Sequence, residues 1–249
     1  MILRPAVPAA LAAALRDKSI DVGLIPSIDY QQAGAQWQIL PIAAIVSEGP
    51  VLTVRIFSRR PIDQIDELAC DTDSHTSVVL ARIIWRLQFN KSLQIHPLRN
   101  LDKEPAVLLI GDKVLPQLGR WSYELDLGEA WTCQTALPFV YAFWTIGARG
   151  DWDRLADILH SAYRDGLAHL DQINSQYAAR HGFTEEQAKR YFVENIHFQF
   201  GPRQRQGLER FYRLAYKFGF LPRLLPLRFY SSPVCREQPQ DLSCPPHPV

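Results

Sequence analysis

The stretch Asp71-Thr72-Asp73-Ser74-His75-Thr76-Ser77 gathers hydroxyl and carboxylate groups directly ahead of an amphipathic helix pattern. Apolar residues between Val78 and Leu87 recur at helical spacing, which predicts one buried face. The free N–H groups and the dipole at such a helix start attract an anion. A simple helix cap formed by Ser74 or Thr76 would give the same pattern. On these residues alone, both an anion site and a cap remain open.

Two other polar residues also follow segments that are predicted to be strands. Ser27 comes after 21–25, and Asp112 comes after 106–110. Because ligands of α/β sheets bind beyond the carboxyl ends of strands, we expect Ser27, Thr76 and Asp112 near one site. Asp112 is either a general acid or base, or the cap of the next helix.

Two side chains near these positions have less specific interpretations. His75 is expected to be a solvent-facing loop residue of the turn. Tyr141 lies in an aromatic run from Phe139 to Trp144 that predicts a buried strand, from which its hydroxyl could reach a ligand. The sequence contains no glycine-rich phosphate loop, no serine nucleophile elbow and no paired-histidine motif, so it indicates no metal site.

Strand and helix patterns alternate in the first half of the chain. A helix is expected over 8–16, and strands are expected over 21–25, 40–46, 51–58 and 106–110. Such alternation is typical of an α/β fold with a largely parallel sheet. The second half is mainly helical, with helices predicted over 153–176, from Thr184 in capping-box style, and over 206–218. The proline-rich end, 233–249, is predicted to be disordered.

Composition limits the class of protein. The 249 residues are 47% hydrophobic and 21% charged, with a net charge of +1, so no overall field favours nucleic acid or an anionic membrane. The four cysteines form no CxxC pair, which indicates a reduced protein without a zinc site. No apolar run is long enough for a transmembrane helix, and the N-terminus lacks a secretory pattern, so we expect a cytoplasmic protein.

Several segments, in order, carry a resemblance to a known family. They are 21–30, 49–54, 57–58, 71–77, 109–112, 126–131, 135–142, 191–196 and 207–212. Together they span about residues 8 to 221. With these segments the chain resembles the chorismate dehydratases of the futalosine route to menaquinone, which are related to type II periplasmic binding proteins.

The resemblance implies a fold of two α/β lobes joined by two crossing hinge strands, with a helical C-terminal region and the substrate between the lobes. The crossing strands would be Val51–Phe57 and Phe139–Ile146. Residues 1–57 with 146–232 would form the first lobe, and 58–145 would form the second lobe.

The resemblance also implies a reaction, the removal of water from chorismate to give 3-(1-carboxyvinyloxy)benzoate. Aromatisation drives it, so no metal, nucleotide or redox cofactor is expected. The implied partner is a small dicarboxylate, bound by a monomer or homodimer. The implied substrate-binding residues are Pro26, Ser27, Thr53, Thr76, Ser77 and Tyr141, and the implied catalytic residues are Thr53 and Asp112.

Three features depart from the pattern of this family. The usual first strand with a Tyr-Leu-Asn motif is missing before residue 8, Ala136 replaces a usual glycine, and His75 stands where arginine is common. A non-catalytic carboxylate-binding protein of the same fold and an inactive truncated copy therefore stay as alternatives. A sister enzyme that cleaves cyclic dehypoxanthinyl futalosine is less favoured, because its catalytic histidine has no counterpart near Asp112.

Overall fold

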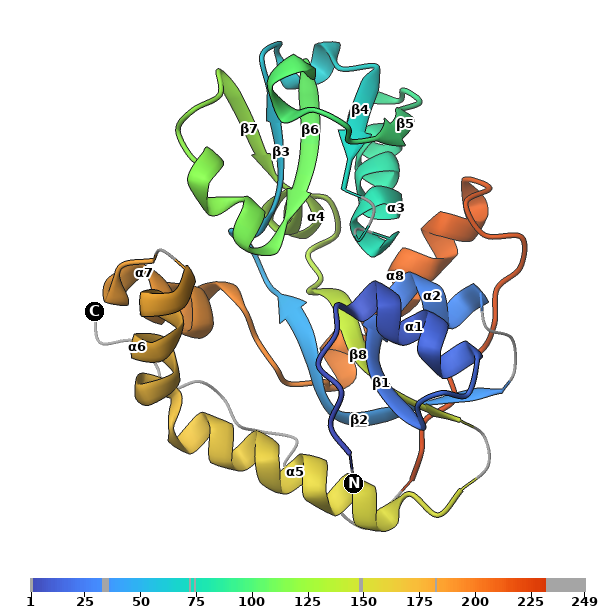
Figure 1. Cartoon of the computed structure of the whole chain (residues 1–249). Coiled ribbons are helices and arrows are strands. Elements are labelled where there is room, and N and C mark those ends of the chain that lie inside the picture. The colour runs from blue at the N-terminus through green and yellow to red at the C-terminus, as the bar shows by residue number, and fades with distance from the viewer. Residues whose placement is uncertain are drawn as a thin grey trace.

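The computed structural model describes residues 2–32, 36–71, 73, 75–147, 150–181 and 183–231. Its strands form two separate sheets, which lie in two halves of the molecule (Figure 1). We call these halves the three-strand lobe and the five-strand lobe. The predicted proline-rich tail, 233–249, and Ser74 lie outside the described residues.

The three-strand lobe contains a sheet in the order β1-β8-β2, with both pairings antiparallel. The strands are β1 (Val22–Pro26), β2 (Trp37–Ser47) and β8 (Phe139–Gly147). Helices α1 (Pro8–Arg16) and α2 (Ser27–Gln32) flank β1 in the chain, and α8 (Pro202–Lys217) packs on β8. The central strand, β8, is buried along most of its length, and therefore anchors this lobe.

The five-strand lobe contains a sheet in the order β5-β4-β6-β3-β7. The strands are β3 (Val54–Ser58), β4 (Glu67–Cys70), β5 (Gln94–Pro97), β6 (Ala106–Ile110) and β7 (Tyr123–Asp126). Helix α3 (His75–Ile84) continues as a π-helical turn, Trp85–Phe89, and α4 (Leu127–Thr135) follows β7. Leu80, Ile83 and Ile84 of α3 are fully buried, as the helical spacing predicts.

The expectation of a largely parallel sheet is wrong. Among the strands of the described residues, β4 alone pairs in parallel, with β5 and β6, while β3 and β8 run antiparallel to their neighbours. The parallel pair β4 and β5 is the one that α3 connects, and a helical crossover is what parallel pairing requires. Strands β3 and β8 each follow a crossing between the lobes, and each runs in the direction opposite to its neighbours in the sheet.

The two connections between the lobes are short. The strand expected over 51–58 begins only at Val54, because Leu52 has a left-handed backbone (φ 68°) that ends the extended run. All pairing of β3 lies in the five-strand lobe, and all pairing of β8 lies in the three-strand lobe. The chain therefore crosses between them at 48–53 and at 136–138.

The second crossing explains one departure noted in the sequence. Ala136 ends α4 in a left-handed conformation (φ 56°), which glycine adopts without strain. The crossing is held by aromatic rings of Trp131, Phe139 and Phe211, whose centroids lie 5.0–6.2 Å apart in edge-to-face pairs. These rings fasten α4 and α8 to the first residue of β8.

The C-terminal region is helical, with one difference from the prediction. The helix expected over 153–176 is divided at His169 into α5 (Asp153–Ala168) and α6 (Leu170–His181), and the ring of His169 lies 2.9 Å from the carbonyl of Asp165. Helix α7 (Glu185–Arg190) starts at Thr184 with the predicted capping box, and a π-helical turn, Tyr191–Asn195, follows. We call α6 and α7 the α6–α7 pair.

Candidate functional site

Helices α2 and α3 begin side by side, although they belong to different lobes. The Ser27 and Thr76 hydroxyls lie 3.5 Å apart and both residues are buried. Thr76 Oγ1 accepts a hydrogen bond from the N–H of Ile28 (3.3 Å) and donates one to the carbonyl of Tyr141 (3.3 Å). Thr76 is therefore not the cap of its own helix. Its hydroxyl satisfies an unpaired N–H at the start of α2 and joins the lobes.

The other predicted binding residues near this point are buried as well. Ser77 follows Thr76 in α3 and is 5% exposed, and Pro26 ends β1 opposite Ala142. The Tyr141 hydroxyl lies 3.1 Å from Ser47 Oγ. Burial raises the pKa of Tyr141 well above its ordinary value, so the phenol stays protonated.

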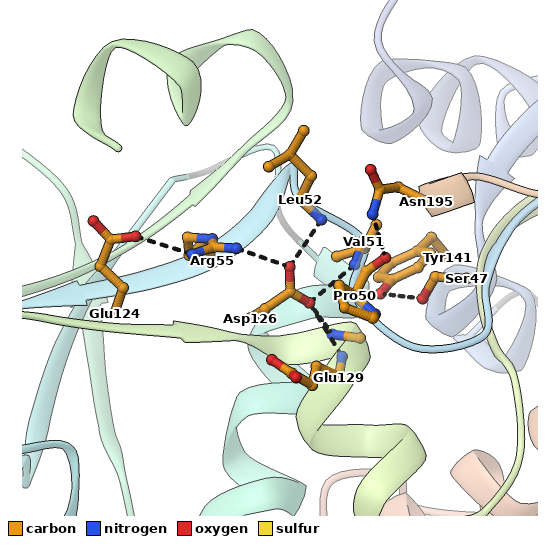
Figure 2. A network of polar contacts seen from close by, with 11 residues as sticks. Ser47, Pro50, Val51, Leu52, Arg55, Glu124, Asp126, Glu129, Tyr141 and Asn195 are labelled. Atoms are coloured by element: carbon orange, nitrogen blue, oxygen red, sulfur yellow. Dashed lines mark hydrogen bonds and ion pairs between the residues drawn. The ribbon is translucent and has the colours of Figure 1, made fainter. Parts of the chain in front are cut away.

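Asp126 ties the two crossings together (Figure 2). Its carboxylate accepts hydrogen bonds from the N–H groups of Val51 (3.0 Å) and Leu52 (2.8 Å), and from the first N–H groups of α4. Arg55, which also binds Glu124, completes the network with an ion pair to Asp126 (3.3 Å). One buried carboxylate thus fixes the first crossing to the helix that leads to the second.

Thr53 lies on the first crossing and contacts a tyrosine. Its hydroxyl is 3.0 Å from the hydroxyl of Tyr191, and both side chains are buried. Burial raises the pKa of Tyr191 to about 12, although the Thr53 hydrogen bond lowers it. Thr53 therefore connects the hinge to the C-terminal helices and does not touch Ser27 or Thr76 in any hydrogen bond of the described residues.

Asp112 binds the α6–α7 pair. Tyr177 donates a hydrogen bond to Asp112 Oδ1 (2.6 Å), and His181 Nδ1 lies 2.6 Å from Asp112 Oδ2. The Asp112 carboxylate is 49% exposed, and no bond from it to the following turn occurs in the described structure. The interpretation of Asp112 as a helix cap is therefore wrong. Rings of Tyr177 and Tyr191 stack with centroids 6.2 Å apart and link this contact to Thr53.

A cavity of about 370 Å³ lies between α2 and the edge of the five-strand lobe formed by β4, β5 and α3. Most of its wall is apolar, with polar groups at the end where β4 leads into α3. Its lining residues are Ile28, Gln32, Cys70, Asp71, His75, Val78, Val79, Ile95, His96 and Pro97. The cavity therefore borders the start of α3, where the sequence predicts an anion site, and it lies at the carboxyl ends of two parallel strands.

His75 is the first residue of α3, so its interpretation as a loop residue is wrong, whereas its side chain is exposed as expected. Its Nδ1 lies 2.9 Å from Asp29 Oδ2 and 3.1 Å from Oδ1. The Asp29 side chain is 3% exposed, whereas that of His75 is 44% exposed. The hydrogen bond that the His75 ring donates to Asp29 is the largest cause that raises the pKa of His75 above its ordinary value, while burial lowers it. The pair joins α2 to α3 across the cavity.

The structure thus separates the predicted residues into two groups. Ser27, Thr76 and the backbone of Tyr141 come together beside the cavity, whereas Thr53 and Asp112 contact tyrosines of the C-terminal region. Asp29 was missed by sequence reasoning, and its one available signal is its place two residues after Ser27. Asp126 was missed in the same way, although an aspartate ahead of a helix is typical of an N-cap.

No group of three or more histidine, cysteine, aspartate or glutamate side chains in the described ranges could hold a metal ion. Among the described helices, none has the length and hydropathy needed to cross a bilayer.

Comparison with solved structures shows the fold. A protein from Archaeoglobus fulgidus matches with a TM-score of 0.66 and 16% identity, over 88% of this chain and 86% of that one. The periplasmic aliphatic sulphonate binding protein of Escherichia coli matches with a TM-score of 0.63 and 17% identity, over 92% and 81%. The chain therefore has the two-lobed fold of periplasmic binding proteins.

Sequence comparison shows the family. A curated protein named chorismate dehydratase, from Thermus thermophilus, is 26% identical over 232 residues, which are 83% of this chain and 83% of that protein. The family model described as menaquinone biosynthesis matches residues 2–217. Since this match covers most of the chain, the protein belongs to the menaquinone biosynthesis family.

Proposed function

We propose that the protein is a chorismate dehydratase, a hydro-lyase that converts chorismate to 3-(1-carboxyvinyloxy)benzoate and water. Membership of the menaquinone biosynthesis family and the similarity to a chorismate dehydratase support this activity. The same observations support a place in the futalosine route and in the cytoplasm. The observation that carries the proposal is the start of α3, where His75 and Val78 line a cavity of about 370 Å³ and Thr76 and Ser77 lie between these two residues in the chain.

In this proposal a carboxylate of chorismate binds at the start of α3. The free N–H groups of the first turn and the hydroxyls of Thr76, Ser77 and Ser27 supply hydrogen bonds to an anion. The Thr76 hydroxyl donates to the carbonyl of Tyr141 in the present arrangement, so it would turn its hydrogen from that carbonyl to the substrate carboxylate. The apolar wall of the cavity suits the ring, and Pro26 and Tyr141 support the wall from β1 and β8.

Thr53 and Asp112 keep the catalytic roles that the sequence predicts for them as part of this proposal. Thr53 lies on the crossing that any opening of the lobes must bend, and its contact with Tyr191 responds to that movement. Asp112 accepts bonds at both carboxylate oxygens, so it handles a proton only after the α6–α7 pair moves away.

The experiment is direct. The purified protein is incubated with chorismate, and the aromatic enol ether is measured by chromatography against an authentic standard, with heat-treated protein as the control. Formation of 3-(1-carboxyvinyloxy)benzoate in proportion to protein concentration supports the proposal. Tight and reversible binding of chorismate without product would contradict it and would favour a binding protein of the same fold.

A further inference from the structure

One histidine of the cavity has the geometry of a proton acceptor. The Nδ1 of His75 lies against the buried carboxylate of Asp29, so the N–H at Nδ1 is donated and the lone pair of the neutral ring is at Nε2. His75 lines the cavity, and Nε2 has no hydrogen-bond partner within the described part of the chain. A buried carboxylate that fixes the tautomer of a histidine is the usual arrangement of a general base.

The other titratable groups of the cavity wall are less suited to accept a proton. Burial raises the pKa of Cys70 to about 12, so its thiol stays protonated. Asp71 is neutralised by the ammonium group of Lys113, with 2.5 Å between Nζ and Oδ2. The ring of His96 has Glu104 at 3.8 Å and lacks a close, buried carboxylate. Among the described lining residues, His75 therefore combines a fixed tautomer with a nitrogen available to the cavity.

We propose that His75 Nε2 accepts the proton that the dehydration removes, and that Asp29 is a positioning residue which orients the ring. This inference rests on the proposed function, and it assigns the proton transfer to His75 in place of Asp112. In the step, the C–H bond next to the hydroxyl-bearing ring carbon breaks, and its electron pair forms the new ring double bond. The C–O bond breaks with its pair, and the departing hydroxide takes the proton back from His75 to leave as water. The histidine ends neutral, so the step needs no other reactant.

The placement of the pair adds a condition to the reaction. Asp29 lies in α2 of the three-strand lobe and His75 in α3 of the five-strand lobe, so the pair exists only when the lobes meet. The acceptor is therefore assembled by closure of the lobes over the cavity, which also excludes water.

Several charges act on the titration of His75. Asp29 and Asp73 raise its pKa, whereas Arg16 of α1 and burial lower it. Asp71 and His96 line the same cavity. Because the neutral ring is the working form, activity should fall on the acid side as His75 becomes protonated.

The test compares single variants in the full chain with chorismate as substrate. His75→Gln keeps an N–H for Asp29 but has no basic nitrogen, and we expect kcat to fall by about 100-fold or more with a small change in KM. Asp29→Asn should shift the acid limb of the kcat/KM profile to lower pH, which a merely structural role would not do. His160→Gln in α5 is the matched control and should retain full activity.

A second measurement does not depend on a variant folding. NMR titration of histidine-labelled wild type should give a His75 pKa that matches the acid limb of its own kcat/KM profile. A wild type that dehydrates chorismate while folded His75→Gln does so at the same rate would overturn this inference alone, and so would an acid limb that differs from the His75 titration. A wild type that forms no product overturns the proposed function and this inference with it.

Discussion

Two histidine–aspartate pairs join separate parts of the molecule, and they differ in burial. Asp29 and His75 connect α2 to α3, while Asp112 and His181 connect the five-strand lobe to the α6–α7 pair. The Asp29 carboxylate is 3% exposed and that of Asp112 is 49% exposed. The first carboxylate depends on its histidine for neutralisation, whereas water can solvate the second.

This difference in burial indicates which contact controls the arrangement of the lobes. A contact that water can replace is broken at little cost, so the α6–α7 pair can separate from Asp112 easily. Separation at Asp29 exposes or isolates a buried charge, and it also breaks the Thr76 bonds beside it. The cavity side of the molecule is therefore the stronger of the two connections.

The largest expected effect is that of His75→Ala. It leaves the Asp29 carboxylate buried without its partner, which should lower the free energy of unfolding by about 2 kcal/mol. Chemical denaturation with circular dichroism measures the change. Restoration of wild-type stability in the double variant with Asp29→Asn would show that the unpaired charge is the cause. A His75→Ala protein as stable as wild type would contradict the inference that the Asp29–His75 contact is the stronger of the two connections.

The stabilisation that the Asp29–His75 pair provides should change with pH in one direction. Asp29 raises the pKa of His75 in the folded protein above its ordinary value of about 6.5. The stabilisation is therefore fully present below that ordinary value and is lost as pH rises through the folded value. Asp73 and Arg16 act on the same ring, with opposite signs. Unfolding of wild type and His75→Ala across this range should give curves that converge as the pH rises.

Thr76→Val tests the hydroxyl that lies beside the first pair. The N–H of Ile28 loses its acceptor, which should cost about 1–2 kcal/mol of stability, and loss of a charge-assisted bond to a substrate carboxylate should lower kcat/KM by about 10- to 150-fold. Ser77→Ala is the informative companion. No hydrogen bond of its side chain occurs among the described residues, so it should reduce turnover without a comparable loss of stability.

Tyr191→Phe probes the region between the two pairs. The Thr53 hydroxyl loses its buried partner, and the free energy of unfolding should fall by about 1 kcal/mol. Thermal unfolding measures this effect, with Tyr216→Phe on the exposed face of α8 as the control. A change equal to that of His75→Ala would mean that the Thr53–Tyr191 contact stabilises the protein as much as the Asp29–His75 pair does.

The smallest expected effect is that of His181→Ala. Because Asp112 is half exposed and keeps its bond from Tyr177, stability should change by less than about 1 kcal/mol. The loss should shrink further at high ionic strength, since salt screens exposed pairs. A loss of stability equal to that of His75→Ala and unaffected by salt would show that burial of the carboxylate does not determine how much each histidine–aspartate pair contributes.

Much of the fold could be predicted from local patterns. The boundaries of α1 and β6 and the start of α7 after Thr184 follow from helical spacing, a short apolar run and a capping box. The position of the break at His169 could not be predicted, because the poorest helix former nearby, Gly166, lies inside α5 and the helix continues past it. The direction of the strands could not be predicted from the sequence either, since it depends on how the chain crosses between the lobes.

The site shows the same limit. Ser27 and Thr76 could be expected to meet, because each follows the end of a strand. Asp29 could not be recognised, since a single acidic residue in a six-residue helix has no distinctive spacing. Its role comes from burial and from His75, which lies 46 residues away in the chain. Contacts of this kind depend on packing between lobes, which no local pattern specifies.

The central place of β8 has a consequence for synthesis of the protein. The chain emerges from the ribosome in order, so β1 and β2 are made long before the strand that separates them in the sheet. The five-strand lobe is complete in sequence before β8 appears. During that interval the two early strands have unpaired edges, which are sites of aggregation. Under conditions that slow folding, this protein should therefore aggregate first through β1 and β2. Early binding of a chaperone to these strands should reduce this aggregation.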